Sequence, residues 1–411
     1  MSRSGLWLSA RVLLLMLAIG GTTGLAGAFF LWALFAVTDA RDANEGLVWL
    51  LPVAGALIGA FYERWGRASV AGTSLVVEAL HTPTLRLPKA FAPIAVLATV
   101  ASHAFGASVG REGSALQLGA GVADLATRPF ALTAPARRAL LVAGVAAGFG
   151  AVFGTPLAGA VFAVELLGRG ARRLRLLPLA VVCAVVADAT SRAVGSSHVQ
   201  LPELSWPAFS WALALGLVVF ALALALLLRA FLGALRGLQA WTAARIPSRP
   251  RRLAVGGAVV VALWLVVGSS AYLGLGVPAI EASFLGAPED PWAFAWKCLF
   301  TVVSVGFGFP GGEVTPLFFM GATLGSALAD AAHLPVALFA GVGMFALFGA
   351  ASRAPLALSV MAMETLGVVA GPFVLVVSVA TMALGGGRGL YDRTGSAPDD
   401  ESVSEYEEHG T

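Results

Sequence analysis

The sequence predicts an all-α membrane protein built from many tilted and interrupted helices. Of its 411 residues, 58% are hydrophobic and 12% are charged, shares that lie outside those of soluble globular domains. Apolar runs of about 20 residues, the length that crosses a bilayer, recur as far as residue 384. Because no long polar gap separates these runs, one membrane domain embedded in the lipid bilayer is expected over residues 1–395.

The long apolar runs are predicted to cross the membrane, and the short ones to be broken. The run at residues 13–37 is too long for the core of a signal peptide, so we expect it to be retained. Further crossings are expected at 47–61, 176–194 and 211–235. Five segments are too short, or too rich in glycine and proline, to cross alone: residues 71–80, 114–125, 155–168, 314–331 and 354–367. Such breaks are tolerated only beside protein or a water-filled cavity, which indicates a transport path.

The charged residues indicate how the chain is oriented. With the first arginines, Arg3 and Arg11, in the cytoplasm, the acidic loop 39–45 lies outside and the basic segment 63–67 lies inside. We therefore expect a multi-pass protein of the cell (inner) membrane with cytoplasmic termini. The net charge of +3 comes with short arginine clusters, which fit topology signals better than a nucleic-acid surface. The acidic segment 396–411 is predicted to be a disordered tail.

An internal repeat divides the chain into two related halves, at about residues 10–240 and 250–392. The stretch 150–168 is similar to 349–367, and each copy contains Pro-Leu-Ala and ends with a glutamate shortly before a glycine. Related halves of transporters commonly face each other across a site at mid-membrane, and inverted orientation is our inference here. Because Glu165 and Glu364 occur in both copies, a structural role is favoured for them.

The glycine-flanked Glu112 is the strongest functional candidate. Gly110 and Gly113 allow a tight turn and leave backbone amides bare at the start of a helix predicted from Ser114, and such amides form an anion site. Arg111 belongs to the same loop. A carboxylate can occupy this site itself and leave it when protonated, which would couple proton uptake to anion movement. The alternative is a structural glutamate paired with Arg111. Because charged residues at membrane depth are usually functional, the gating role is favoured.

A second break lies at residues 309–316 and again contains a glutamate. Glu313 could relay protons and Thr315 could donate a hydroxyl to an anion; the alternative is a helix cap with a first-turn acid. Thr73 and Ser74 open a short helix and either face the ion path or cap that helix. Tyr391 could reach back to hydrogen-bond an ion, although its position alone favours an interfacial tyrosine.

Other chemistries find no support in the sequence. The histidines form no His-Glu-x-x-His pattern, no Walker motif is present, and the two cysteines lie in separate apolar runs. Residues 106–110 match the Gly-x-Ser-x-Gly nucleophile pattern by chance, because no strand precedes them and no Asp and His partners are evident. Ser108 is instead a candidate hydroxyl donor to an anion. We expect no enzyme, cofactor or metal site.

These motifs resemble those of the CLC family of chloride channels and anion/proton antiporters. The resemblance covers about residues 10–392 and includes the gating-glutamate motif at 110–113, the helix from Gly154 to Glu165 and the second loop at 312–316. It implies a CLC-type fold of tilted and re-entrant helices in two inverted repeats, and a homodimer with a path in each subunit. Tyr391 lies where the family places its pore tyrosine.

Departures from the chloride-type motifs resemble the fluoride/proton antiporter branch. The chain has Gly-Thr-Ser at residues 72–74, Gly-Gly-Glu-Val-Thr-Pro at 311–316, and Leu166 where chloride/proton antiporters carry a second glutamate. The resemblance implies export of fluoride in exchange for protons, with Glu112 as gate and Glu313 in the proton route. A chloride/proton antiporter or chloride channel of the same fold is the alternative.

Overall fold

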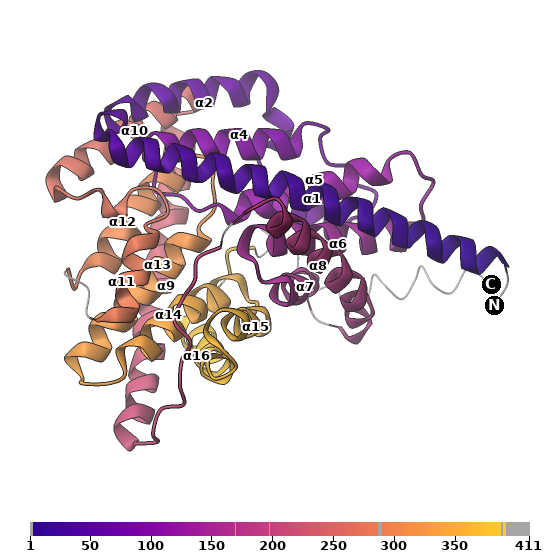
Figure 1. The fold of residues 1–411 in the computed structure, drawn as a ribbon. Coiled ribbons are helices and arrows are strands. Elements are labelled where there is room, and N and C mark those ends of the chain that lie inside the picture. The colour runs from indigo at the N-terminus through magenta and orange to yellow at the C-terminus, as the bar shows by residue number, and fades with distance from the viewer. Residues whose placement is uncertain (1–2, 169, 197, 287–289, 388, 392–411) are drawn as a thin grey trace.

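A computed structural model describes residues 3–168, 170–196, 198–286, 290–387 and 389–391. The described part of the chain is helical, with short 3-10 turns between some of the helices (Figure 1). The α-helices are α1 (Arg3–Ala43), α2 (Leu51–Trp65), α3 (Thr73–His81), α4 (Phe91–Ala104), α5 (Glu112–Thr127), α6 (Ala134–Phe153), α7 (Pro156–Glu165), α8 (Leu177–Ala193), α9 (Trp211–Arg245), α10 (Arg249–Val267), α11 (Val277–Leu285), α12 (Ala293–Gly306), α13 (Val314–Ala331), α14 (Val336–Ser352), α15 (Pro355–Leu366) and α16 (Ala370–Gly385). The predicted acidic tail, 396–411, lies outside the described residues.

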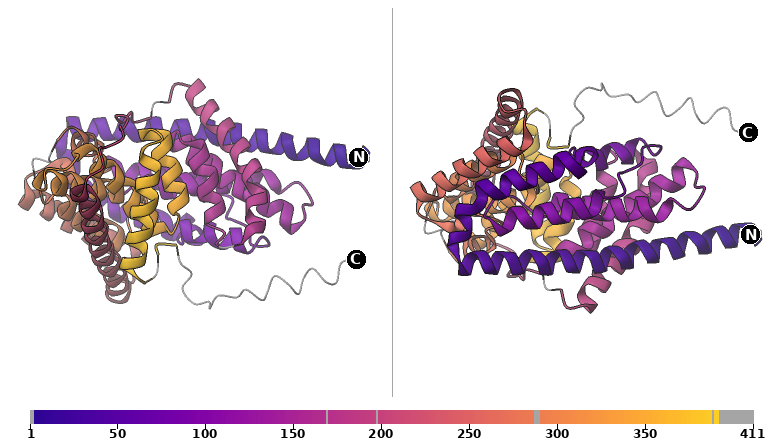
Figure 2. Two further views of the ribbon diagram at one scale, coloured as in Figure 1. Left: turned by 90° about the horizontal axis from the view of Figure 1, so that it is seen from below. Right: turned by 90° about the horizontal axis from the view of Figure 1, so that it is seen from above.

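Seven helical segments of the described chain are long and apolar enough to cross a membrane. Between them lie short helices such as α3, α7 and α15, which the glycine and proline breaks predicted, and α11, which they did not. The prediction that residues 314–331 are too short to cross alone is wrong by length and composition, because α13 is one of the seven segments, and the crossings at α6 and α10 were not predicted. Two predicted crossings are longer than expected, because α1 runs to Ala43 and α9 to Arg245. Arginine, glutamine and alanine are good helix formers, so these helices continue past their apolar runs. The N-terminal part of α1 projects beyond the other helices (Figure 2).

A repeat that was missed in the sequence spans α4 and the loop after it, and recurs in α12 and its loop. The same residue types stand at the same spacing in both copies: Thr99, Ser102, Gly106 and Gly110 in the first, and Thr301, Ser304, Gly308 and Gly312 in the second. Gly106 and Gly308 also share a left-handed backbone, with φ of 92° and 96°. The two loops meet in an antiparallel bridge between Gly110 and Gly312, as expected for inverted repeats.

The two copies also cap each other's helices. The Glu165 carboxylate at the end of α7 accepts hydrogen bonds from the first amides of α15, 2.7 Å from Ala357 N. In return, the Glu364 carboxylate near the end of α15 accepts from the first amides of α7, 2.7 Å from Ala158 N. Each acid satisfies orphan N–H groups at a positive helix end. This is the structural role expected for the two glutamates.

Glycine residues allow the helices around the central loops to pack with their backbones in direct contact. A Cβ at Gly119 on α5 would collide with the carbonyl of Gly144 on α6, and one at Gly321 on α13 would collide with the carbonyl of Gly343 on α14. Lipid removes most of the hydrophobic drive for helix association, so close van der Waals packing between small residues holds such pairs together. These contacts hold α5 and α13, whose first turns carry the central loops.

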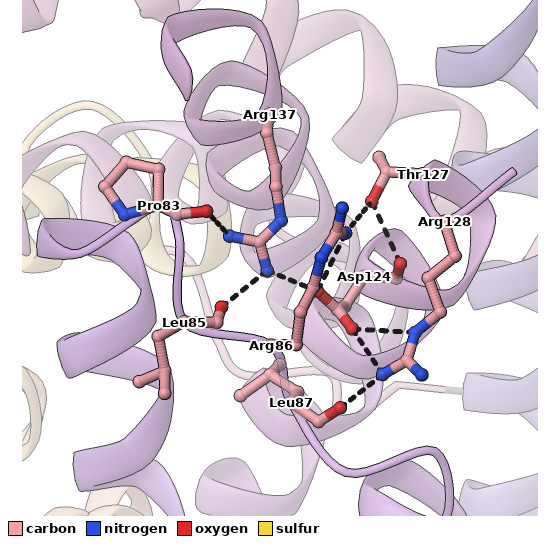
Figure 3. A network of polar contacts seen from close by, with 8 residues as sticks. All are labelled: Pro83, Leu85, Arg86, Leu87, Asp124, Thr127, Arg128 and Arg137. Carbon is pink, nitrogen blue, oxygen red and sulfur yellow. Dashed lines mark hydrogen bonds and ion pairs between the residues drawn. The ribbon is translucent and has the colours of Figure 1, made fainter. Parts of the chain in front are cut away.

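A buried ion-pair cluster anchors the far end of α5. Asp124 is paired with Arg128, Arg137 and Arg86, and the three arginine side chains converge on its carboxylate (Figure 3). Arg137 also donates to the carbonyls of Pro83 and Leu85. The cluster therefore ties α5 and α6 to the segment that follows α3.

Candidate functional site

The two glycine breaks form one site where the halves of the chain meet. Gly312 N donates to Gly110 O at 2.8 Å, and Gly110 N donates to Gly312 O at 2.5 Å. A Cβ at Gly113 would lie 3.1 Å from Thr73 Oγ1 and 3.5 Å from Gly312 Cα, so α3 begins beside the same junction. Residues distant in sequence thus bring the helix starts of α3, α5 and α13 together.

Glu112 lies at the centre of this junction and is fully buried. It is the first residue of α5, whereas the sequence analysis placed the helix start at Ser114. Its Oε1 accepts a hydrogen bond from the Thr315 hydroxyl, whereas its buried Oε2 has no hydrogen-bond partner among the described residues. The backbone N–H groups of Glu112 and Thr315 lie near the carboxylate. A Cβ at Gly110 would collide with the carboxylate, so only glycine leaves room for the Glu112 side chain there. A carboxylate therefore occupies a set of donors that would equally suit a free anion.

A cavity of about 240 Å³ lies beside the buried carboxylate. Four predicted site residues line it: Thr73, Ser74, Glu313 and Tyr391. Glu313 is the residue before α13 and is half-buried, in contrast to the fully enclosed Glu112. The wall of the cavity thus contains the Glu313 carboxylate and several hydroxyl groups, next to the enclosed carboxylate of Glu112.

Two predicted anion contacts, Arg111 and Ser108, do not line the cavity, and Nε and Nη1 of the buried Arg111 have no hydrogen-bond partner among the described residues. The Arg111 guanidinium lies 5.9 Å from the ring centroids of Phe35 and Phe153. The Ser108 hydroxyl is 3.1 Å from Thr301 Oγ1, and the Ser108 amide donates to Ser304 Oγ. Ser108 therefore joins the two loops. That it offers its hydroxyl to an anion stays a prediction, because either oxygen of the Ser108–Thr301 pair could be the donor.

Sequence reasoning missed several polar residues of the cavity wall. Gln117 is buried on α5, lines the cavity, and has no hydrogen-bond partner for its amide among the described residues. Arg249 and Tyr62 also line the cavity, with the guanidinium 4.6 Å from the ring centroid. The sequence did contain a signal for Gln117, because its side-chain amide stands five residues after Glu112 among mostly small and apolar residues. Tyr62 and Arg249 gave none, because their helices, α2 and α10, meet only in the fold.

The site offers groups that can bind protons and groups that can bind anions. In the described residues, no group of three or more His, Cys, Asp or Glu side chains is arranged to hold a metal ion. The two carboxylates of the site can bind protons. Its hydroxyl groups and the backbone amides at its helix starts can bind anions.

Comparisons with known proteins agree with this reading. A family model described as voltage gated chloride channel matches residues 54–385. A chloride/fluoride channel protein from Pseudomonas syringae pv. tomato is 41% identical over 397 residues, which cover 94% of this chain and 85% of the relative. A putative chloride channel protein ClcB-like from Ralstonia nicotianae is 32% identical over 396 residues, covering 85% of this chain and 88% of the relative.

The crystal structure of a CLC-type fluoride/proton antiporter has the same fold. It matches with a TM-score of 0.87 at 30% identity, covering 93% of this chain and 96% of that chain. The predicted fold class is thereby confirmed, and the family consists of channels and transporters, not enzymes. The chain belongs to the CLC family of anion channels and antiporters.

Proposed function

We propose that the protein exports fluoride in exchange for protons, with Glu112 as the gate. The observation that carries this proposal is the position of the Glu112 carboxylate, which occupies the donor set formed by the Thr315 hydroxyl and nearby backbone amides. A negatively charged side chain in an anion site competes with a free anion for the same donors. Protonation removes the charge, so the side chain leaves and the anion takes its place.

Glu313 carries the proton between the cavity and Glu112. It lines the cavity, it precedes α13, and Thr315 two residues later bonds to the gate. A half-buried carboxylate at this position can take up a proton from water in the cavity and release it toward the buried one. Proton and anion then use the same junction in alternation, which produces exchange.

Fluoride is the favoured anion for a chemical reason. It is small and strongly hydrated, so its site must replace water with several strong donors. Hydroxyls of Thr315, Thr73 and Ser74 lie at or beside the junction. The names of two relatives, a chloride/fluoride channel protein and a CLC-type fluoride/proton antiporter, support the same anion. Chloride is the second candidate, because the family model and the Ralstonia relative are described by chloride.

Flux from proteoliposomes tests this function. We expect purified protein to release fluoride faster than chloride, with proton uptake that continues against a pH gradient. Chloride release as fast as fluoride release would refute the anion assignment. E112Q removes the titratable group while keeping its size, so we expect anion movement without proton coupling. E281Q, at an exposed position on α11, is the matched control and should stay coupled. Coupled transport in E112Q would remove Glu112 from the gate.

Two further expectations belong to this proposal. The distribution of arginines supports a cell-membrane protein with cytoplasmic termini, which places the cavity at the end of α2 on the cytoplasmic side. The family resemblance supports a homodimer with a separate path in each subunit. Sided labelling of introduced cysteines and crosslinking in membranes would test these two points.

A further inference from the structure

A lysine lies buried on α12, outside the site described above. Lys297 is fully buried, and its ammonium donates to the carbonyls of Gly274 at 2.6 Å and Tyr272 at 3.1 Å. Its nitrogen is 5.2 Å from the ring centroid of Phe319. No ion pair joins Lys297 to a carboxylate within the described residues. An ammonium has three hydrogens to donate, so two carbonyls leave one over.

A second buried cation lies against the same loop. A Cβ at Gly274 would be 2.5 Å from Arg41 Nη1, so the guanidinium packs on the residue whose carbonyl binds Lys297. Arg41 donates to the carbonyl of His103 and pairs with Asp42, whose side chain is 57% exposed. The Nε2 of the buried His103 has no partner among the described residues. Basic groups thus outnumber acids in this part of the interior.

The repeat shows that this cluster is the counterpart of the cavity. In the first copy, Ala95, Thr99 and Gln117 line the cavity beside the start of α3. The positions at the same spacing in the second copy are Lys297, Thr301 and Phe319, beside the start of α11. The glycines before these two helices correspond as well. A Cβ at Gly72 would lie 3.4 Å from the Gln117 amide, and one at Gly276 would lie 2.7 Å from the Phe319 ring.

The equivalent position in the two copies is therefore a cavity in the first copy and is filled by Lys297 and Phe319 in the second. The two places lie at opposite ends of α2: the cavity includes Tyr62 and the segment after the helix, whereas Gly106, in the loop after α4, has Val48 and Arg41 as neighbours. The helix has 15 residues, which separates its ends by about 22 Å. With the cavity on the cytoplasmic side, Lys297 and Phe319 close the outer side.

Hydroxyl groups on the helix of Lys297 bond to the loop that precedes the gate. Thr301 is one turn further along α12 and bonds to the Ser108 hydroxyl, and Ser304 accepts from the Ser108 amide. Ser108 stands two residues before Gly110 of the central bridge. An uncompensated buried charge is costly, and charged groups at membrane depth face a partner or a functional path.

We propose that Lys297 is the outer anion-binding residue, which takes the transported anion on the side of the gate opposite the cavity. This inference rests on the proposed exchange of an anion for protons. An arriving anion supplies the charge that Lys297 lacks and bonds to its remaining hydrogen, while Phe319 moves aside. Arg41 adds attraction from the same loop. The inner cavity and the outer cluster are then the two ends of one route.

Three substitutions of Lys297 separate charge from structure. K297R keeps the charge, K297Q keeps donors for the two carbonyls without the charge, and K297M keeps only the apolar chain. Initial efflux is measured against fluoride concentration in proteoliposomes. We expect K297Q and K297M to raise the KM for fluoride about tenfold, the effect of one charge-assisted contact. K297R should stay near wild type, and proton coupling should persist in all three.

The KM for fluoride separates an anion-binding role of Lys297 from a purely structural one. If K297Q matches wild type in KM, Lys297 only ties the loop, and the proposal is overturned. R41Q gives a second reading even where the Lys297 variants do not fold: we expect about a threefold rise in KM from the loss of a nearby charge, and an unchanged KM in folded R41Q also contradicts the proposal. Wild-type protein in the same liposomes shows whether fluoride is carried at all, so failure of the proposed function is visible separately.

Discussion

Replacing Asp124 by asparagine tests the energetics of the cluster that anchors α5. The Asp124 and Arg137 side chains are 1% and 4% exposed, whereas Arg128 and Arg86 reach solvent at 26% and 44%. The substitution keeps the size of the side chain and one acceptor oxygen but removes its charge. Arg128 and Arg86 can turn to water. Arg137 cannot, so its guanidinium becomes a buried charge without a counter-ion (Figure 3).

The expected loss follows from the remaining contacts of Arg137. Removing one partner of a buried ion pair costs about 3–5 kcal/mol. Arg137 retains the carbonyls of Pro83 and Leu85, the latter at 2.7 Å, so part of its hydrogen bonding survives. We therefore expect D124N to lower the free energy of unfolding by about 3 kcal/mol, at the lower end of that range.

Unfolding in mixed detergent and SDS micelles, followed through the 10 tryptophans, measures this loss. The matched control is D188N on α8, where Asp188 forms an i,i+4 pair with Arg192. There the side chains are 13% and 50% exposed, so we expect less than about 1 kcal/mol. If D124N loses no more stability than D188N, burial of the Asp124 pair does not set its strength, and the reasoning is refuted.

Three further substitutions test how the halves are joined and how tightly α13 packs on α14. E165A and E364A each remove a cap from the opposite repeat, so we expect similar losses of about 1 kcal/mol each, measured by the same unfolding assay; a loss in only one variant would contradict reciprocal capping. G321A places a methyl group against the carbonyl of Gly343, so we expect a loss of about 1–3 kcal/mol, against no loss for G233A, whose Cβ meets nothing within 4 Å. Equal stability of these two variants would show that α13 and α14 adjust freely.

Much of the fold was predictable because lipid imposes simple constraints on a chain. The length of apolar runs identified crossings such as α8, and glycine and proline breaks identified short helices such as α3, α7 and α15, but they wrongly marked α13 as too short to cross. Helix ends were less predictable. Polar residues after an apolar run, as near Arg245, can continue the helix into water, so the end of the apolar run does not mark the end of the helix. The repeat across α4 and α12 was missed because it consists of a few small residues separated by variable ones.

The loops of the candidate site were predictable, whereas the residues that line its cavity were predicted only in part. Glu112, Glu313 and Thr315 stand in glycine-rich breaks, so local sequence marked them, and the structure brings these loops together. Arg111 has the same signal, yet its side chain turns to aromatic rings. Side-chain direction depends on packing between helices, which no local pattern encodes. Gln117 was missed because a single amide in a helix has many structural uses.

The inverted repeat gives the candidate site two unlike halves, as the proposed exchange of two ions requires. A symmetric scaffold provides two equivalent helix starts that meet at Gly110 and Gly312, but the residues that follow differ. Position by position, Arg111 of the first loop corresponds to Glu313 of the second, and Gly113 corresponds to Thr315. The proposed gate, Glu112, therefore comes from one half and the hydroxyl that bonds to it from the other, with the proposed proton carrier, Glu313, two residues before that hydroxyl. Neither half contains the site alone, and the unlike residues at equivalent positions make the two sides of the membrane chemically different.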